Sequence, residues 1–224
     1  MVYKLDSTIG FPDPRLGEED GLFAVGGDLS VDRLLLAYSN GIFPWYPFKK
    51  EDAFMLDEDG QPLIEWWCPM DRFVIFPKEI HVSHSMKQMI KRGDYAVTIN
   101  ADFDGVIGNC SKLRIDTKGA WLGPEMVSAF KRLHELGFAA SVEVWNKQNE
   151  LVGGLYGVTI GKCFFGESMF SLVPSASKLA LIFLAKLLEN GGGVMIDCQF
   201  ETAHLLTMGG RHITYDEYMK NVKS

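Results

Sequence analysis

SVEVWNKQNELVGGLYGVTIGKCFFGESMF, residues 141–170, is the stretch that decides the fold. It holds three hydrophobic runs, 141–145, 150–160 and 162–170, separated by a polar NKQN turn and by a single glycine. Hydrophobic runs joined by short turns are typical of neighbouring antiparallel strands. We therefore predict that these residues form the centre of a β-sheet.

Helical and strand-like segments alternate on both sides of this stretch. Residues 72–76 and 95–100 have strand composition, and the segment between them predicts a helix that begins at Ser83 or Ser85 and stops at Gly93. A second helix opens at Pro124 and ends at Gly137.

The last third of the chain continues the alternation. A strongly apolar helix starts at Ser175 or Ser177 and ends at the glycines 191–193, and residues 194–200, VMIDCQF, read as a short buried strand. Two helical patches follow, the second with a capping box from Thr214 to Glu217.

The first 60 or so residues read as loop, helix, loop. Asp28 or Ser30 caps the helix, and Asn40 with Gly41 ends it. Residues 41–67 carry two aromatic clusters around an acidic stretch, which indicates a surface loop or linker. We predict an α+β protein with a mostly antiparallel central sheet, divided into a small N-terminal domain, 1–62, and a larger domain, 63–224.

Composition indicates a folded protein of the reducing cytoplasm. Of 224 residues, 47% are hydrophobic and 23% charged, and no apolar run approaches the roughly 20 residues that span a bilayer. The start of the chain lacks the basic end and apolar core of an export signal, so we expect no membrane partner. The four cysteines lie far apart, without a C-x-x-C pair, and are expected to be buried thiols.

Charge is distributed unevenly along the chain. Residues 1–71 hold 5 basic and 14 acidic side chains, a net charge of −9, whereas residues 72–224 hold 17 basic and 15 acidic ones, a net charge of +2. Five cations lie between positions 72 and 92, where the only acid is Glu79: Arg72, Lys78, Lys87, Lys91 and Arg92. This cluster is either an ordinary solvated helix face or a surface that meets nucleic-acid phosphates.

Asp197 and Gln199 are the first candidate chemical groups. They stand two apart in a strand pattern, which places both side chains on one face and Cys198 on the other. A buried carboxylate and amide need hydrogen-bond partners. The alternative is structural, with Asp197 capping a helix near Thr202 or holding a loop.

Glu167 is the second candidate, because it lies in an aromatic and Met-rich strand. Such a carboxylate faces either a cationic ligand or an internal arginine. In a regular strand it shares a face with Phe165 and Met169, but a bulge at Gly166 would reassign these faces.

Large rings in loops are a third feature. Trp45, Trp66, Trp67 and Trp121 lie in or beside loops, where they either stack on bases or cover the core.

A G-x-S-x-G elbow, an H-E-x-x-H motif and a Walker A loop are absent, and the histidines show no i, i+4 pairing. The sequence therefore predicts neither a self-contained hydrolase nor a metal site.

Several uncommon strings occur in a fixed order along the chain. They are FAVGGDLSVDRLLLAYSNGIFPWY, WWCPMDRFVIFP, HVSHSMK, RLHELGFAASVEVW, ELVGGLYGV, FFGESMFS, SASKLAL and IDCQ. Together they resemble the leucyl/phenylalanyl-tRNA–protein transferases from about Phe11 to Tyr218. The acidic stretch 49–61, which is longer than usual, and the end at Ser224 depart from the family pattern.

The resemblance implies a C-terminal domain of the acetyltransferase-like (GNAT) fold and a reaction without cofactor or metal. Leucine, phenylalanine and, less well, methionine would move from aminoacyl-tRNA to proteins that start with Arg or Lys, marking them for N-end-rule degradation. It assigns Asp197 and Gln199 to catalysis. Glu167 is our own candidate for shaping the end of the active site and meeting the charge of the acceptor Arg or Lys. Trp45 and Trp121 match positions near the tRNA 3′ adenosine, and the pocket for the aminoacyl side chain would comprise Leu155, Phe164, Met169 and Ile196.

Two other functions compete with this one. A GNAT acetyltransferase needs a glycine-bearing loop for the coenzyme A pyrophosphate, and the corresponding loop here, residues 171–178 (SLVPSASK), has no glycine. A non-catalytic module would bind aminoacyl-tRNA or protein N-termini without consuming them.

Overall fold

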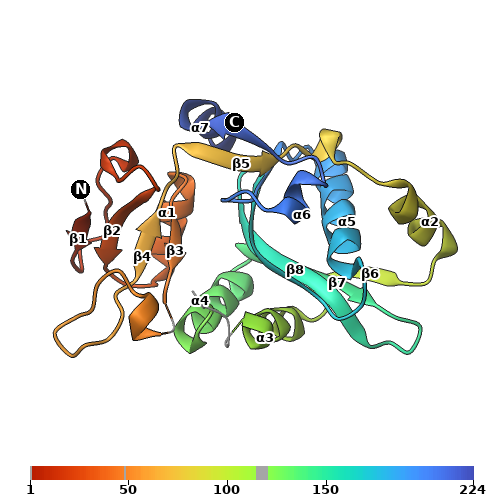
Figure 1. Ribbon diagram of the computed structural model, residues 1–224, viewed down its shortest axis with the longest axis horizontal. Coiled ribbons are helices and arrows are strands. Elements are labelled where there is room, and N and C mark those ends of the chain that lie inside the picture. Colours follow the sequence, from red (N-terminus) through yellow and green to blue (C-terminus); the bar gives the residue numbers. More distant parts are fainter. Residues whose placement is uncertain (1, 48, 115–120) are drawn as a thin grey trace.

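The computed structural model describes residues 2–47, 49–114 and 121–224. Figure 1 shows two β-sheets beside each other, with the smaller one built from the N-terminal part of the chain. The larger sheet carries helices on both faces.

The smaller sheet has four strands in the described part of the chain. Their order is β1 (Tyr3–Leu5), β2 (Leu22–Gly26), β4 (Glu65–Trp67) and β3 (Phe43–Trp45). β1 and β2 are parallel, and the other neighbours are antiparallel. Short 3-10 turns occur at Pro14–Leu16 and Lys50–Asp52 in this part of the chain.

The prediction of a loop or linker for residues 41–67 is wrong at both aromatic clusters. Phe43 pairs with Trp67, and Trp45 pairs with Glu65, so the clusters form β3 and β4. Strands of three residues are too short to show an alternating pattern, which explains the error. The helix α1 (Val31–Ser39) confirms the predicted one, with the Ser30 hydroxyl accepting a hydrogen bond from a first-turn N–H group.

The larger sheet has seven strands in the described residues. Their order is β11 (Arg211–Thr214), β5 (Asp71–Ile75), β10 (Met195–Asp197), β9 (Cys163–Ser171), β8 (Leu151–Ile160), β7 (Ala139–Trp145) and β6 (Ala96–Ile99). Only β9 and β10 run parallel among these neighbours. The fold is therefore α+β with a mostly antiparallel central sheet, as predicted.

Helices cover both faces of this sheet. α5 (Ala176–Gly191) and α2 (His84–Arg92) share one hydrophobic core, and α3 (Phe103–Arg114) and α4 (Pro124–Glu135) share the other with the smaller sheet. A 3-10 turn at Pro77–Glu79 precedes α2, and the short α6 (Ala203–Leu206) and α7 (Tyr215–Val222) complete the chain.

Local capping signals predicted most helix ends correctly. Ser83 caps α2 and Gly93 ends it in the left-handed conformation, while Thr214 caps α7. The sequence patterns missed α3 and β11. The division into residues 1–62 and 63–224 stays a prediction, and the smaller sheet takes β4 from beyond that boundary.

Two glycines of β8 allow close packing beside the cavity described below. A Cβ atom at Gly153 would lie 2.4 Å from the Ala176 Cβ at the start of α5, and one at Gly157 would lie 2.1 Å from the Phe165 carbonyl oxygen. Only glycine therefore fits at these two positions. The GGLYG string, which we read as a strand, serves this packing.

Candidate active site

A cavity of about 530 Å³ opens between β3, strands β8, β9 and β10, and helices α5 and α6. All nine residues predicted for catalysis or substrate binding line it: Trp45, Trp121, Leu155, Phe164, Glu167, Met169, Ile196, Asp197 and Gln199. Residues separated by up to 154 positions, as Trp45 and Gln199 are, thus meet at one site. A cavity of this size is typical of small-molecule and cofactor sites.

One end of the cavity is an apolar slot formed by three neighbouring strands. Ile196 of β10 lies opposite Phe164 of β9, and Leu155 of β8 lies opposite Met169 of β9. Leu181 and Leu184 of α5 complete the lining. The sequence analysis missed these two leucines, because an apolar helix does not reveal which of its residues face a cavity.

A β-bulge places Glu167 at the cavity. Tyr156 pairs with Ser168 and Gly157 pairs with Gly166, so Glu167 is the extra residue of β9. Beyond the bulge, Met169 lies on the face of Phe164 and not on that of Phe165. β9 therefore contains the bulge that we considered at Gly166, and Met169 does not share a face with Phe165 as it would in a regular strand.

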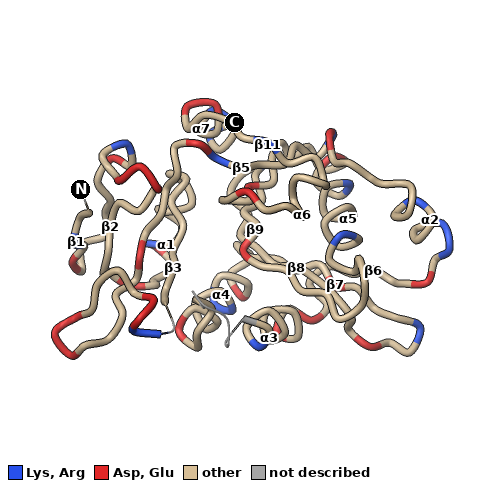
Figure 2. The backbone as a smooth tube through the Cα atoms, viewed as in Figure 1, with Lys and Arg blue, Asp and Glu red and all other residues tan. Residues whose placement is uncertain are grey.

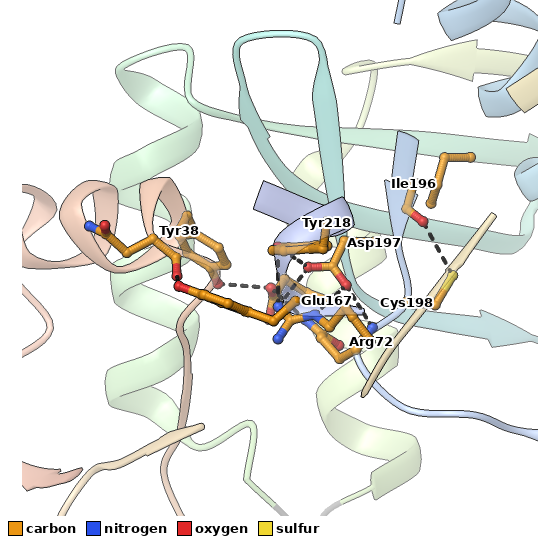
Figure 3. A network of polar contacts seen from close by, with 10 residues as sticks. Tyr38, Arg72, Glu167, Ile196, Asp197, Cys198 and Tyr218 are labelled. Carbon is orange, nitrogen blue, oxygen red and sulfur yellow. Dashed lines mark hydrogen bonds and ion pairs between the residues drawn. The ribbon is translucent and has the colours of Figure 1, made fainter. Parts of the chain in front are cut away.

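Glu167 is buried and held by two donors. The Tyr38 hydroxyl donates to its Oε1 at 2.8 Å (Figure 3). The Gln199 side-chain amide donates to the same oxygen at 3.1 Å. Burial raises the pKa of Glu167 to about 8; Asp197 adds to the shift, while Tyr38 and Arg72 oppose it. The carboxyl is therefore poised to gain or lose a proton near neutral pH.

An internal arginine is one of the two alternatives for Glu167, but the buried arginine at this site pairs with Asp197. Arg72 donates from Nε and Nη2 to the two carboxylate oxygens of Asp197, at 2.9 and 2.7 Å, and both side chains are buried. The Tyr218 hydroxyl donates to Asp197 Oδ2 at 2.8 Å. Burial opposes the charge of Arg72, but Asp197 raises the pKa of Arg72 above its usual range.

This ion pair removes Arg72 from the predicted cationic cluster. Its guanidinium lies between the rings of Phe43 and Tyr218, 4.8 and 4.7 Å from their centroids, and cannot reach a phosphate at the surface. The lysines and Arg92 of α2 are exposed. Figure 2 shows these basic positions in blue along the helix.

Gln199 does not continue the strand of Asp197. β10 ends at Asp197, and Gln199 adopts a left-handed φ of 61°, which is rare for a residue with a side chain. Its backbone N–H donates to Asp197 Oδ1 at 2.8 Å, while its side chain reaches Glu167. Asp197 thus holds the loop through the backbone of Gln199, and the expectation of simple strand alternation is wrong there.

The tryptophans differ in their surroundings. The ring centroids of Trp45 and Trp121 lie 5.4 Å apart, and both residues line the cavity. Trp66 is fully buried and donates from Nε1 to the Gly26 carbonyl oxygen, so it is a core residue. Trp67 is half-buried and bonds to Glu65.

Two further side chains at the cavity wall have a buried polar atom without a hydrogen-bond partner in the part of the chain that the structure describes. The Oγ of Ser168 and the Nε2 of His204 are buried, and no described residue hydrogen-bonds to them. Burial, with a smaller effect of Lys178, lowers the pKa of His204, so its imidazole is neutral at pH 7. Neither residue was singled out from the sequence.

The sequence also makes predictions about the cysteines, possible metal ligands and possible membrane helices. Cys68, Cys110 and Cys163 are buried, Cys198 is half-buried, and none forms a disulfide. Within the described ranges, three or more metal-ligating side chains never gather at one point. A helix long and apolar enough to cross a bilayer is not found in those ranges either.

Comparisons with known proteins agree on one family across nearly the whole chain. Residues 74–223 match the family model of leucyl/phenylalanyl-tRNA protein transferase, and residues 27–70 match the model of its N-terminal domain.

Curated relatives carry the same name. The protein of Nitrosospira multiformis is 46% identical over all of this chain and 91% of its own length, and that of Syntrophus aciditrophicus is 48% identical over 97% of this chain and 86% of its own. The protein of Syntrophobacter fumaroxidans is 46% identical over 97% and 88%. Each is called leucyl/phenylalanyl-tRNA–protein transferase.

Proposed function

Because this chain belongs to the leucyl/phenylalanyl-tRNA protein transferase family, we propose that it transfers an aminoacyl group from tRNA to the N-terminal α-amine of a protein. The protein is an aminoacyltransferase. The observation that carries the assignment of its site is the meeting of an apolar slot, a tryptophan pair and a buried carboxyl in one cavity.

The reaction is aminolysis of an activated ester. The aminoacyl group is joined to the ribose of the tRNA 3′ adenosine, and the acceptor amine replaces the ribose oxygen. A free α-amine has a pKa of about 7.7–8.0, so much of it is protonated at neutral pH and must lose a proton before it attacks. The residues of the cavity must therefore position two substrates and handle one proton.

The apolar slot suits the aminoacyl side chain. Leucine, phenylalanine and, less well, methionine are the proposed donors, and the flexible thioether of Met169 adapts to side chains of different shape. One methylene distinguishes substrates by only about 1–3 kcal/mol. Isoleucine and valine are rejected by the shape of the slot at the branched carbon.

Trp45 and Trp121 are proposed to hold the 3′ adenosine. Their rings lie next to each other at the cavity wall, and stacking of a base on an aromatic ring is independent of the rest of the tRNA sequence. This arrangement suits an enzyme that accepts several tRNAs.

Glu167 is proposed to meet the positive charge of an acceptor that begins with Arg or Lys. Such a cation lowers the pKa of the buried carboxyl and ionises it on binding. We expect Glu167→Gln to weaken binding of the acceptor more than binding of the donor in steady-state kinetics. Equal rises in KM for the acceptor and the donor would reject this role.

Asp197 and Gln199 are proposed to orient the acceptor amine. Asp197 fixes the left-handed turn through the backbone N–H of Gln199, and the Gln199 amide lies beside Glu167 at the cavity. A glutamine is not a base, so its role is positional. The product would enter bacterial N-end-rule degradation.

The larger sheet is proposed to have a GNAT-like fold. Its mostly antiparallel order and the start of α5 at the cavity support this proposal. We place the enzyme in the cytoplasm, where aminoacyl-tRNA is made.

One assay separates this function from its competitors. Radiolabelled leucyl-tRNA is incubated with the protein and an Arg-initiated peptide, and acetyl-CoA replaces the tRNA in a parallel reaction. A transferase moves label to the peptide, a GNAT acetyltransferase acetylates it only with acetyl-CoA, and a binding module leaves the leucyl ester intact. The last two results would overturn the proposal.

A further inference from the structure

We propose that Glu167 is the general base of the transfer reaction, taking the proton from the attacking α-amine and passing it to the departing ribose oxygen. This inference rests on the proposed function and adds a chemical step to it. It assigns the proton to a carboxyl at the cavity, and leaves the Asp197–Gln199 pair with a positional role.

The two oxygens of Glu167 differ in their surroundings. Oε1 accepts from Tyr38 of α1 and from Gln199, so the carboxyl is fixed at one end. No described residue donates a hydrogen bond to Oε2. Glu167 lines the cavity, and one carboxylate oxygen therefore remains to accept a proton from a substrate.

Asp197 lacks such an oxygen. A carboxylate has about four lone-pair positions, and those of Asp197 receive two bonds from Arg72, one from the Gln199 backbone and one from the Tyr218 hydroxyl. Its negative charge is also balanced by the buried guanidinium. Asp197 is thus saturated, whereas Glu167 is not.

The surroundings of Glu167 match its acidity to that of the substrate. Burial raises the pKa of Glu167 to about 8, close to the value of about 7.7–8.0 for a free α-amine. Charged and titratable groups act on it from three elements: Tyr38 of α1, Asp197 of β10 and Arg72 of β5. Tyr218 of α7 donates to Asp197 and not to Glu167. A base with this pKa transfers protons efficiently near neutral pH.

The proposed step balances in atoms and charge. The acceptor amine enters in its neutral form, after losing its ammonium proton to solvent. As its nitrogen bonds to the ester carbonyl carbon, ionised Glu167 takes one N–H proton. The bond from that carbon to the ribose oxygen then breaks, the oxygen keeps the electron pair and takes the proton from Glu167, and the carboxylate is restored.

Two acceptors distinguish a base from a mere counter-charge. One peptide begins with Arg, and the other begins with citrulline, the uncharged isostere of Arg. If Glu167 is the base, Glu167→Gln lowers the single-turnover rate with both peptides by roughly 10²- to 10⁴-fold. A loss confined to the Arg peptide would overturn the inference, and failure of the wild-type enzyme to transfer at all would instead overturn the proposed function.

The pH dependence supplies a second readout. Below pH 7 the logarithm of kcat/KM for the acceptor should rise with a slope of about two for the wild-type enzyme, because the amine and Glu167 both ionise, and with a slope of about one for Glu167→Gln. Equal slopes would contradict the inference. Circular dichroism and the thermal midpoint check that the variant is folded.

Tyr38→Phe tests the same point with Glu167 in place. The hydrogen bond from Tyr38 favours the ionised carboxylate, so its loss should raise the pKa of Glu167. The acidic limb of the plot of log kcat/KM against pH should therefore move to higher pH. An unchanged limb in a folded Tyr38→Phe enzyme would count against Glu167 as the titrating base.

Discussion

Arg72 and Asp197 form a buried bidentate ion pair, with N–O distances of 2.9 and 2.7 Å, between adjacent strands of the central sheet. Asp197 lines the cavity, Arg72 lies behind it, and Asp197 fixes the turn that carries Gln199. The first consequence of the pair is for stability, because each partner is isolated from water.

Removing one partner of this pair should destabilise the protein strongly. Arg72→Met and Asp197→Ala each leave a buried charge without compensation, and each should lower the free energy of unfolding by about 3–5 kcal/mol in urea. The double variant Arg72→Met/Asp197→Ala should lose less unfolding free energy than the sum of the losses in the two single variants. As a control, Glu135→Gln in the exposed pair with Arg132 should change stability by less than about 0.5 kcal/mol.

Catalysis should also depend on Asp197. Any folded Asp197→Ala enzyme should turn over slowly while binding a puromycin-like donor almost normally, because Asp197 acts through Gln199 and not on the donor. Lost donor binding would show that Asp197 maintains the whole cavity.

Glu167 should make stability fall with rising pH. Its pKa is about 8 in the folded protein against an ordinary value of 4.5, so between these values the folded state holds a proton that the unfolded state has lost. The contribution is complete below pH 4.5 and is lost as pH rises toward 8, at up to about 1.4 kcal/mol per pH unit. Urea unfolding at several pH values should show that the free energy of unfolding of Glu167→Gln falls less steeply across this range than that of the wild-type protein. Equal pH dependence in the two proteins would contradict the raised pKa of Glu167.

The apolar slot should control donor choice. Met169→Ala enlarges the slot, so kcat/KM for leucyl-tRNA should fall about tenfold or more, while phenylalanyl-tRNA loses less because its ring fills part of the vacated space. Leu172→Ala, which shortens an exposed leucine three residues away, is the matched control and should leave both donors unchanged. Equal effects of Met169→Ala on the two donors would place the aminoacyl side chain elsewhere.

Trp45 should contribute to every donor alike. Loss of one base-stacking contact costs about 1–3 kcal/mol, so Trp45→Ala should raise the KM of both leucyl- and phenylalanyl-tRNA about 5- to 150-fold. Trp45→Phe keeps an aromatic ring and should raise these KM values less. The acceptor KM should not change. An effect on the acceptor alone would remove Trp45 from the proposed adenosine site.

Local chemistry explains which parts of the fold were predictable. Ser30, Ser83 and Thr214 cap helices through contacts within three residues, and Gly93 ends a helix by its own conformation, so sequence patterns locate these ends. The three-residue strands β3 and β4 depend on pairing with each other and carry no periodic signal.

The candidate site was predictable as a set of residues but not as a network. Strand composition and family resemblance identified Glu167 and Asp197, yet their partners Tyr38 and Arg72 lie 129 and 125 positions away. Arg72 belongs by sequence to a surface cluster, and only the fold reveals its buried partner. The bulge at Glu167 likewise depends on how β8 and β9 pair.

Mass spectrometry of the acceptor peptide tests the central claim most directly. After incubation with leucyl-tRNA and the wild-type enzyme, an Arg-initiated peptide should gain one leucyl residue, and fragmentation should place it on the N-terminal α-amine. An unmodified peptide alongside intact leucyl-tRNA would contradict the account.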